Sequence, residues 1–158
     1  MIFITPNTPN EPDYITWIRS IMGVSTTVLP DDSPYIDITY HMSLEWINLY
    51  LDIVAPFIYT QAVYNLGGAY LCTIAQDDPD LSPPNNTYWA NLRSSMGLNN
   101  FIPGLINATN DEDTSAALLV PLNLQNLTLG DLQLLQTPWG RAYLAIAQSV
   151  GSMWGLTL

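Results

Sequence analysis

The chain has very little positive charge. It contains no lysine, and its only arginines are Arg19, Arg93 and Arg141, against 14 aspartates and glutamates, which gives a formal net charge of −11. Proteins that hold a nucleic-acid backbone need clustered lysine and arginine to release the counterions of the phosphates. The scarcity of these residues therefore argues against binding nucleic acid through its backbone.

Charged residues of both signs are scarce as well. They make up 11% of the chain, whereas 48% of the residues are hydrophobic. A typical soluble domain has roughly a quarter charged residues, and monomers seldom expose large apolar patches. We therefore expect part of the surface to be buried against other chains, most simply in a homo-oligomer.

The chain has one cysteine and one histidine, so few side chains are available for catalysis. Cys72 cannot form an intrachain disulfide, and its apolar surroundings predict a small buried side chain. A nucleophile–histidine arrangement would have to use His41, which lies on a plain amphipathic helix without a nucleophile elbow. We expect neither an enzyme nor a bound cofactor.

Metal-binding patterns are also weak. His41 and Glu45 have the one-turn spacing of a two-ligand half-site, but no second histidine exists, so a local hydrogen-bonded pair is expected. The carboxylates of residues 77–80 lack the spacing and distal glutamate of an EF-hand and predict a solvated loop. The acidic residues 111–113 are interpreted as a solvated loop tip, and no metal site is predicted.

An uncharged stretch over residues 53–76 has to be weighed against a membrane span. It contains Pro56 and the pair Gly67–Gly68, and Asp52 and Asp77 flank it in place of basic anchors. The stretch is therefore predicted to be a buried helix, and no membrane partner is expected. The first residues also lack the basic and apolar regions of a signal peptide.

Apolar residues at helical spacing, together with capping residues, predict most of the secondary structure. The predicted helices cover residues 11–22, 34–51, 56–76, 88–96 and 128–135, and a last helix begins at Pro138 behind the capping residue Thr137. In that last helix Trp139, Tyr143, Ile146, Val150 and Met153 form an apolar stripe, which is expected to fill a core. Arg141 lies on the opposite face.

The helix over residues 56–76 is the most apolar and is predicted to be central, with the last helix packed on it. Glycine costs about 1 kcal/mol in a helix interior, so Gly67 and Gly68 indicate the close approach of another backbone.

Two segments differ from this helical pattern. Residues 1–10 are rich in proline, threonine and asparagine and predict an extended arm that docks on a neighbour. Residues 99–121 contain two short apolar runs on either side of a polar turn, a pattern typical of a hairpin or long loop. The predicted fold is a single domain over residues 1–158, mainly α: a small bundle of about five helices with a long extended loop or β-hairpin between the fourth and the fifth.

Three blocks of the chain resemble a known family. They are IYTQAVYNLGGAYL (58–71), NNFIPGLINATNDEDTSAALLVP (99–121) and TLGDLQLLQTPWGRAYLAIAQSVGSMWGL (128–156). They look like small structural proteins of tailed bacteriophages, similar to the helical head–tail adaptors, also called head-completion or neck proteins, which sit beneath the portal.

The resemblance implies a virion subunit made in the host cytoplasm. It would form a ring, commonly of twelve copies, around the channel through which DNA passes without specific binding. Its partners would be the portal protein above and a neck or tail protein below. The expected oligomer or partner contacts are Arg93, Phe101, Ile102, Leu118, Leu119, Arg141 and Trp154. Arg141 is expected to pair with a carboxylate or with helix-end carbonyls of its own or an adjacent subunit.

The sequence does not decide which layer of the neck the ring would form, because adaptors, stoppers and tail terminators are named by their position in the particle. The alternative hypothesis is another virion component, which could be a stopper, a tail terminator or a decoration protein.

Overall fold

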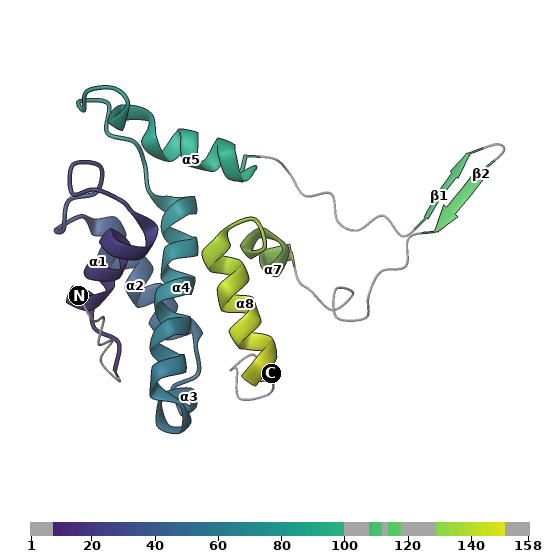
Figure 1. Cartoon of the computed structure of the whole chain (residues 1–158), viewed down its shortest axis with the longest axis horizontal. Coiled ribbons are helices and arrows are strands. Elements are labelled where there is room, and N and C mark those ends of the chain that lie inside the picture. The colour runs from purple at the N-terminus through teal and green to yellow at the C-terminus, as the bar shows by residue number, and fades with distance from the viewer. Residues whose placement is uncertain (1–7, 100–107, 112–113, 118–128, 151–158) are drawn as a thin grey trace.

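The computed structural model describes residues 8–99, 108–111, 114–117 and 129–150, and this part of the chain is mainly helical, as the sequence predicts (Figure 1). The described elements, in chain order, are α1 (Glu11–Trp17), the π-helix η1 (Ile18–Met22), α2 (Pro34–Trp46), α3 (Tyr50–Val54), α4 (Pro56–Ile74), the 3₁₀-helix η2 (Asn85–Thr87), α5 (Tyr88–Met96), β1 (Ala108–Asp111), β2 (Thr114–Ala117), α7 (Leu129–Leu134) and α8 (Pro138–Val150).

The first helix begins and ends where its capping residues predict. The side chain of Asn10 accepts a hydrogen bond from the Asp13 amide at 2.9 Å, which satisfies one of the free amides of the first turn. After Trp17 the helix widens into η1, and Gly23, with φ of 74°, ends it in the left-handed region that glycine adopts without strain. The helix and its end were predicted; the π-helical last turn was not.

The predicted single helix over residues 34–51 is wrong, because the chain breaks after Trp46. Ile47 is extended, and the Asn48 side chain accepts a hydrogen bond from the Tyr50 amide at 2.9 Å, which starts α3. Asparagine side chains compete with helical hydrogen bonds in this way. Ile47 and Leu51 stay buried on either side of the break, so the apolar pattern is kept although the helix is interrupted.

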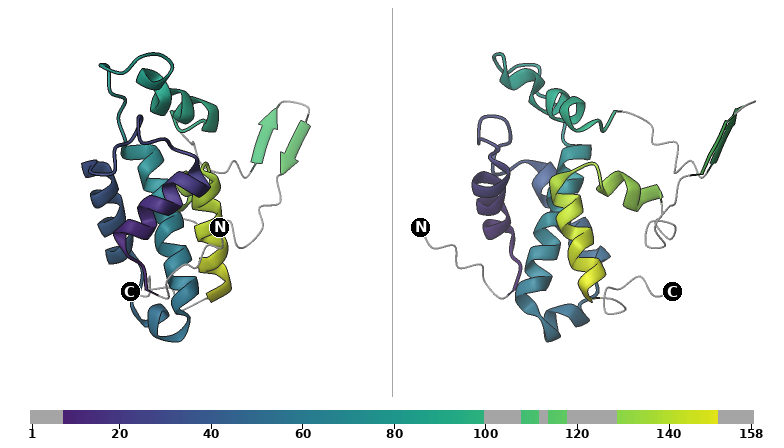
Figure 2. Two further views of the ribbon diagram at one scale, coloured as in Figure 1. Left: turned by 60° about the vertical axis from the view of Figure 1, so that its left-hand side comes forward. Right: turned by 45° about the vertical axis from the view of Figure 1, so that its right-hand side comes forward.

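Helix α4 is the centre of the bundle. Of its side chains, Tyr59, Val63, Leu66 and Leu71 are almost fully buried, and α2, α3, α5 and α8 all pack against it. Figures 1 and 2 show that α8 runs antiparallel to α4, so the end of α8 lies at the α3 end of the bundle. The predicted packing of the last helix on the helix over residues 56–76 is confirmed.

Two aromatic rings, and not another backbone, lie against the glycine pair of α4. A Cβ atom on Gly67 would lie 2.7 Å from the Tyr14 hydroxyl oxygen, and one on Gly68 would lie 2.9 Å from the Trp17 ring. The predicted close approach therefore exists, but the prediction of a backbone neighbour is wrong. Helical spacing could not show that α1 carries its two largest side chains to this point.

Tyr14 also contacts side chains of two other helices. Its ring lies 5.6 Å from the ring of Tyr40 and 5.5 Å from that of Tyr64, and its hydroxyl is 3.1 Å from the Thr39 hydroxyl. Burial of a phenol without a hydrogen-bond partner would be costly, so the contact with Thr39 lets the whole ring lie inside the core. These contacts join α1, α2 and α4.

The turn between α7 and α8 is unusually tight. The Gly140 amide donates to the Thr137 hydroxyl at 2.8 Å, and Pro138 is the first helical residue, as predicted. Tyr143 is buried as expected; Trp139, Ile146 and Val150 are partly buried against the core, and Met153 lies outside the described residues.

A short antiparallel ladder lies within the predicted 99–121 segment. Ala108 pairs with Ala117, and Asp111 pairs with Thr114. Residues 100–107, 112–113 and 118–128 fall outside the described part, and the eight paired residues alone do not support a long loop or hairpin over the whole of 99–121. That feature stays a prediction.

No helix in the described part is both long enough and apolar enough to cross a bilayer.

We predict that Gly140→Ala destabilises the fold. The added Cβ atom would overlap the Leu134 carbonyl and lie 2.7 Å from the Thr137 hydroxyl oxygen. Because the obstacle includes backbone, we expect a loss of about 1–3 kcal/mol in the free energy of unfolding, measured by urea denaturation. Ser149→Ala, on the exposed side of the same helix, is the control and should change it by less than about 0.5 kcal/mol. Equal stability of the two variants would contradict the tight turn.

Candidate functional site

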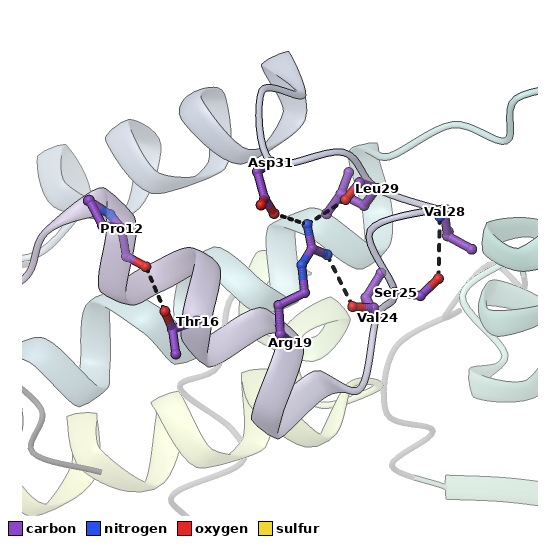
Figure 3. Close-up of polar contacts among 8 residues, drawn as sticks. All are labelled: Pro12, Thr16, Arg19, Val24, Ser25, Val28, Leu29 and Asp31. Atoms are coloured by element: carbon purple, nitrogen blue, oxygen red, sulfur yellow. Dashed lines mark hydrogen bonds and ion pairs between the residues drawn. The ribbon is translucent and has the colours of Figure 1, made fainter. Parts of the chain in front are cut away.

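Arg19 fastens the loop that follows η1 (Figure 3). Its guanidinium donates to the carbonyls of Val24 at 3.1 Å and Leu29 at 2.5 Å, and it forms an ion pair with Asp31. A planar guanidinium can bridge several oxygens at once, which an ammonium group does less well. Arg19 therefore adds side-chain hydrogen bonds to the few backbone ones of this loop.

Arg93 performs a similar task at the end of α4. One of its terminal nitrogens donates to the Ala75 carbonyl at 2.5 Å and lies 3.5 Å from the Cys72 carbonyl. The last carbonyls of a helix have no helical donor, and a cation there is also favoured by the helix dipole. Arg93 thus links α5 to the C-terminal end of α4.

Asp77, which follows α4, in turn contacts the first turn of α5. Its two carboxylate oxygens accept hydrogen bonds from the amides of Trp89 at 2.6 Å and Ala90 at 2.8 Å, in the first turn of α5. A carboxylate at a helix N-terminus satisfies free amides and complements the dipole. The prediction that residues 77–80 form only a solvated loop is therefore wrong for Asp77. Its partners lie 12 and 13 residues away, beyond the reach of a local capping pattern.

Arg141 lies on the exposed side of α8, opposite the buried Tyr143, as the sequence predicts. It donates to the Leu135 carbonyl at 3.0 Å, one residue beyond the end of α7. Of the expected partners, the structure thus provides a helix-end carbonyl of the same chain.

All three arginines of the chain donate to its own main-chain carbonyls. The chain has no lysine to add to them. The chain therefore carries a net negative charge, which repels phosphate groups.

His41 pairs with Asp37, and the predicted pairing with Glu45 is wrong. The Nε2 atom of His41 lies 3.1 Å from a carboxylate oxygen of Asp37, and both side chains are well exposed. Asp37 and Glu45 lie one turn before and one turn after His41, so spacing alone could not choose between them. In the described residues no group of three or more histidine, cysteine or acidic side chains is placed to hold a metal ion.

Cys72 is completely buried in α4, as its apolar surroundings predict. Burial disfavours the thiolate and raises the pKa of the Cys72 thiol to about 12, although the Arg93 charge acts in the opposite direction. A thiol in this state is a poor nucleophile at neutral pH.

The described surface has one concentrated apolar region, which we call the apolar end. It covers the end of α2, the link to α3, the exposed side of α3 and the start of α4. Its exposed side chains are Trp46, Leu49, Tyr50, Ile53, Val54, Phe57 and Ile58. Ile53 is 78% exposed and Leu49 is 68% exposed. Exposed apolar patches of this extent mark interaction sites in soluble proteins.

A hollow of about 510 Å³ opens beside the apolar end, lined by Leu44, Glu45, Ile47, Asn48, Leu49 and Tyr59. The hydroxyl of Tyr59, one of the lining residues, is buried without a hydrogen-bond partner among the described residues, as is one carboxylate oxygen of Asp52. Burial, and secondly the Asp52 charge, raise the pKa of Tyr59. Two buried polar atoms without partners are costly.

A second hollow of about 490 Å³ lies between α4 and α7, and Trp46 connects it to the apolar end. Its other lining residues are Ala69, Tyr70, Thr73, Gly130, Asp131, Gln133, Leu134 and Thr137.

The sequence did not single out the apolar end. A signal was present, because residues 46–58 carry apolar side chains at more helical positions than one buried face can hold. Of the contact residues that were predicted, Phe101, Ile102, Leu118, Leu119 and Trp154 lie outside the described residues. Arg93 and Arg141 both contact their own chain.

Comparison of the chain with protein-family models, with curated proteins and with solved structures gives no match.

We predict different effects for two arginine substitutions. Arg93→Met removes the charged donor at the half-buried end of α4 and should lower the free energy of unfolding by about 1–3 kcal/mol. Arg141→Met removes an exposed contact and should cost less than about 0.5 kcal/mol. Urea denaturation of both variants measures the difference, and a larger loss for Arg141→Met would refute the assignment.

We also predict a loss of stability at alkaline pH that depends on Cys72. The pKa of its thiol is about 12 in the folded chain and roughly 8.5 when unfolded, so the folded state holds the proton more tightly. The contribution of the protonated thiol to the free energy of unfolding is complete below pH ~8.5. It is lost as the pH rises toward 12, by up to about 1.4 kcal/mol per pH unit.

Urea midpoints at pH 7, 8.5 and 9.5 test this expectation. Burial also raises the pKa of several tyrosines, which contribute to the same decline, so the difference between the unmodified chain and a Cys72 variant isolates the thiol. Cys72→Ala should be less stable at every pH but should show a flatter decline between pH 8.5 and 9.5. An unchanged slope in that variant would show that another group causes the decline.

Proposed function

We propose that this chain is a structural subunit of a tailed-phage virion, a head–tail adaptor that forms a ring below the portal. In this role it binds protein partners on several sides and performs no catalysis, and the genome passes through the ring without being bound.

The observation that carries the proposal is the apolar end. Seven large apolar side chains lie exposed within residues 46–58, in a chain that has few charged residues to keep such a surface soluble. Surfaces of this composition are typical of subunits that are buried in an assembly. This supports a protein partner, most simply another copy of the chain.

The charge distribution supports the proposal that DNA passes through the ring without being bound. The chain has 14 acidic residues and no lysine, and each of its three arginines donates to a carbonyl of its own chain. A channel wall that carries net negative charge repels the phosphates of DNA. Such a wall lets a double helix pass without holding it.

The sequence resemblance selects the kind of assembly. It favours a ring of commonly twelve copies, with residues 1–10 and the 99–121 segment providing contacts between copies, to the portal above and to the next neck or tail protein below. The hairpin expected within 99–121 belongs to this proposal.

The proposal is tested by mixing the purified chain with portal rings and with portal-bearing heads. Electron microscopy and native mass measurement should detect a closed ring of this chain directly beneath the portal, at a single vertex. A chain that spreads over the whole capsid would instead be a decoration protein. A stable monomer that never joins the portal would contradict the proposal.

A matched pair of variants tests the part played by the apolar end. Ile53→Asp adds a charge at its most exposed residue and should reduce ring formation at least tenfold without unfolding the bundle. Ile21→Asp adds the same charge at a 56% exposed site on η1, and ring formation should stay within twofold of the unmodified chain. Equal assembly of both variants would remove the apolar end from the interface.

A further inference from the structure

The apolar end is large enough to form an interface by itself. Its seven side chains are between 39% and 78% exposed. Together they expose an area on the order of 800 Å², which is about what each partner buries in a stable protein–protein interface.

The N-terminal segment leaves the bundle at this same end. The Asn10 amide donates to the Tyr64 hydroxyl, which donates to the Asn10 carbonyl, both at 3.2 Å, so the chain is fixed where it enters α1. In Figures 1 and 2 the described chain starts beside the first turns of α4, at the α3 end of the bundle. Seven residues precede this start.

The composition of those seven residues matches the apolar end. Met1 to Ile4 are all apolar, and residues 1–7 carry no charged side chain. Pro6 and Pro9 fix φ near −65° and disfavour helix in the residues before them, which favours an extended chain. Seven extended residues reach about 23 Å.

We propose that residues 1–7 of one copy bind the apolar end of the adjacent copy, where Phe3 and Ile4 cover the exposed side chains of α3 and the start of α4. This inference rests on the proposed ring. Rotation about an axis parallel to α4 places the N-terminal segment of one copy level with the apolar end of the next, because both lie at the same end of the bundle. The contact is repeated from copy to copy and closes with the ring.

Disulfide trapping between two singly substituted chains tests the proposal. One chain carries Ile4→Cys and the other, marked by a mass tag, carries Phe57→Cys; the native Cys72 is buried and does not interfere. After equal mixing, assembly and mild oxidation, we expect a disulfide-linked heterodimer as the main new species on a non-reducing gel. The control replaces Phe57→Cys with Ser94→Cys, which is exposed on α5 at the other end of the bundle and should give at least fivefold less heterodimer.

The doubly substituted chain distinguishes the adjacent copy from the same chain. Ile4→Cys with Phe57→Cys in one chain should give a ladder of linked copies that ends at the ring size. A single monomer band without free surface thiols would show that the segment covers its own apolar end, and would overturn the proposal. A heterodimer yield no higher than in the Ser94→Cys control would overturn it as well. Circular dichroism of each variant verifies that it is folded.

The outcomes also separate this inference from the proposed function. Rings on the portal that do not form the 4–57 disulfide would refute the docking of residues 1–7 and leave the adaptor role intact. Linked copies that never associate with the portal would support the docking and refute the adaptor role.

Discussion

The fold depends on the contact of two aromatic rings with a helix that has no side chains at that point. Tyr14 and Trp17 of α1 lie directly on Gly67 and Gly68 of α4, closer than any Cβ atom would allow. The Tyr14 hydroxyl then meets Thr39, so that the same ring also joins α2 to the core. Interiors are close-packed, and such a ring fits in one position only. The glycine pair thus sets the distance between α1 and α4, and the places of Tyr40 and Tyr64 follow from it.

Each of the three arginines helps to complete backbone hydrogen bonding, and Arg19 also pairs with Asp31. Arg19 bonds the carbonyls of an irregular loop, Arg93 those at the end of α4, and Arg141 one that follows α7. These are places where regular secondary structure leaves acceptors without donors. The same three contacts explain how a chain with 11% charged residues can be ordered inside and still leave an apolar, acidic exterior that suits assembly with other proteins.

Local patterns in the sequence predicted the local features of the fold. Neighbouring residues decide four features that were predicted and found: the Asn10 cap, the glycine ends of two helices, the central helix and the Thr137–Pro138 start. Three features were not predicted. The break after Trp46 depends on competition between two similar local structures. The ring contacts of Gly67 and the hydrogen bonds of Asp77 depend on residues that packing brings together. The apolar end was missed for a related reason. Periodicity identifies apolar side chains, but which of them stay uncovered depends on how the helices are arranged. The adaptor role was expected from the sequence resemblance and stays a proposal. The predicted contact residues Phe101, Ile102, Leu118, Leu119 and Trp154 lie outside the described residues and stay predictions.

The reciprocal contacts between α4 and α5 have a mechanical consequence. Asp77, just beyond the end of α4, holds the first turn of α5, while Arg93 of α5 holds the last carbonyls of α4. The loop between the two helices is therefore bridged at both of its ends, and opposite charges face the matching poles of the two helix dipoles. A pull on the far end of α5 would act on α4 directly and would not first straighten the intervening loop. Helix α5 is thus attached to the central helix at two points, and we expect the two helices to move together as one body.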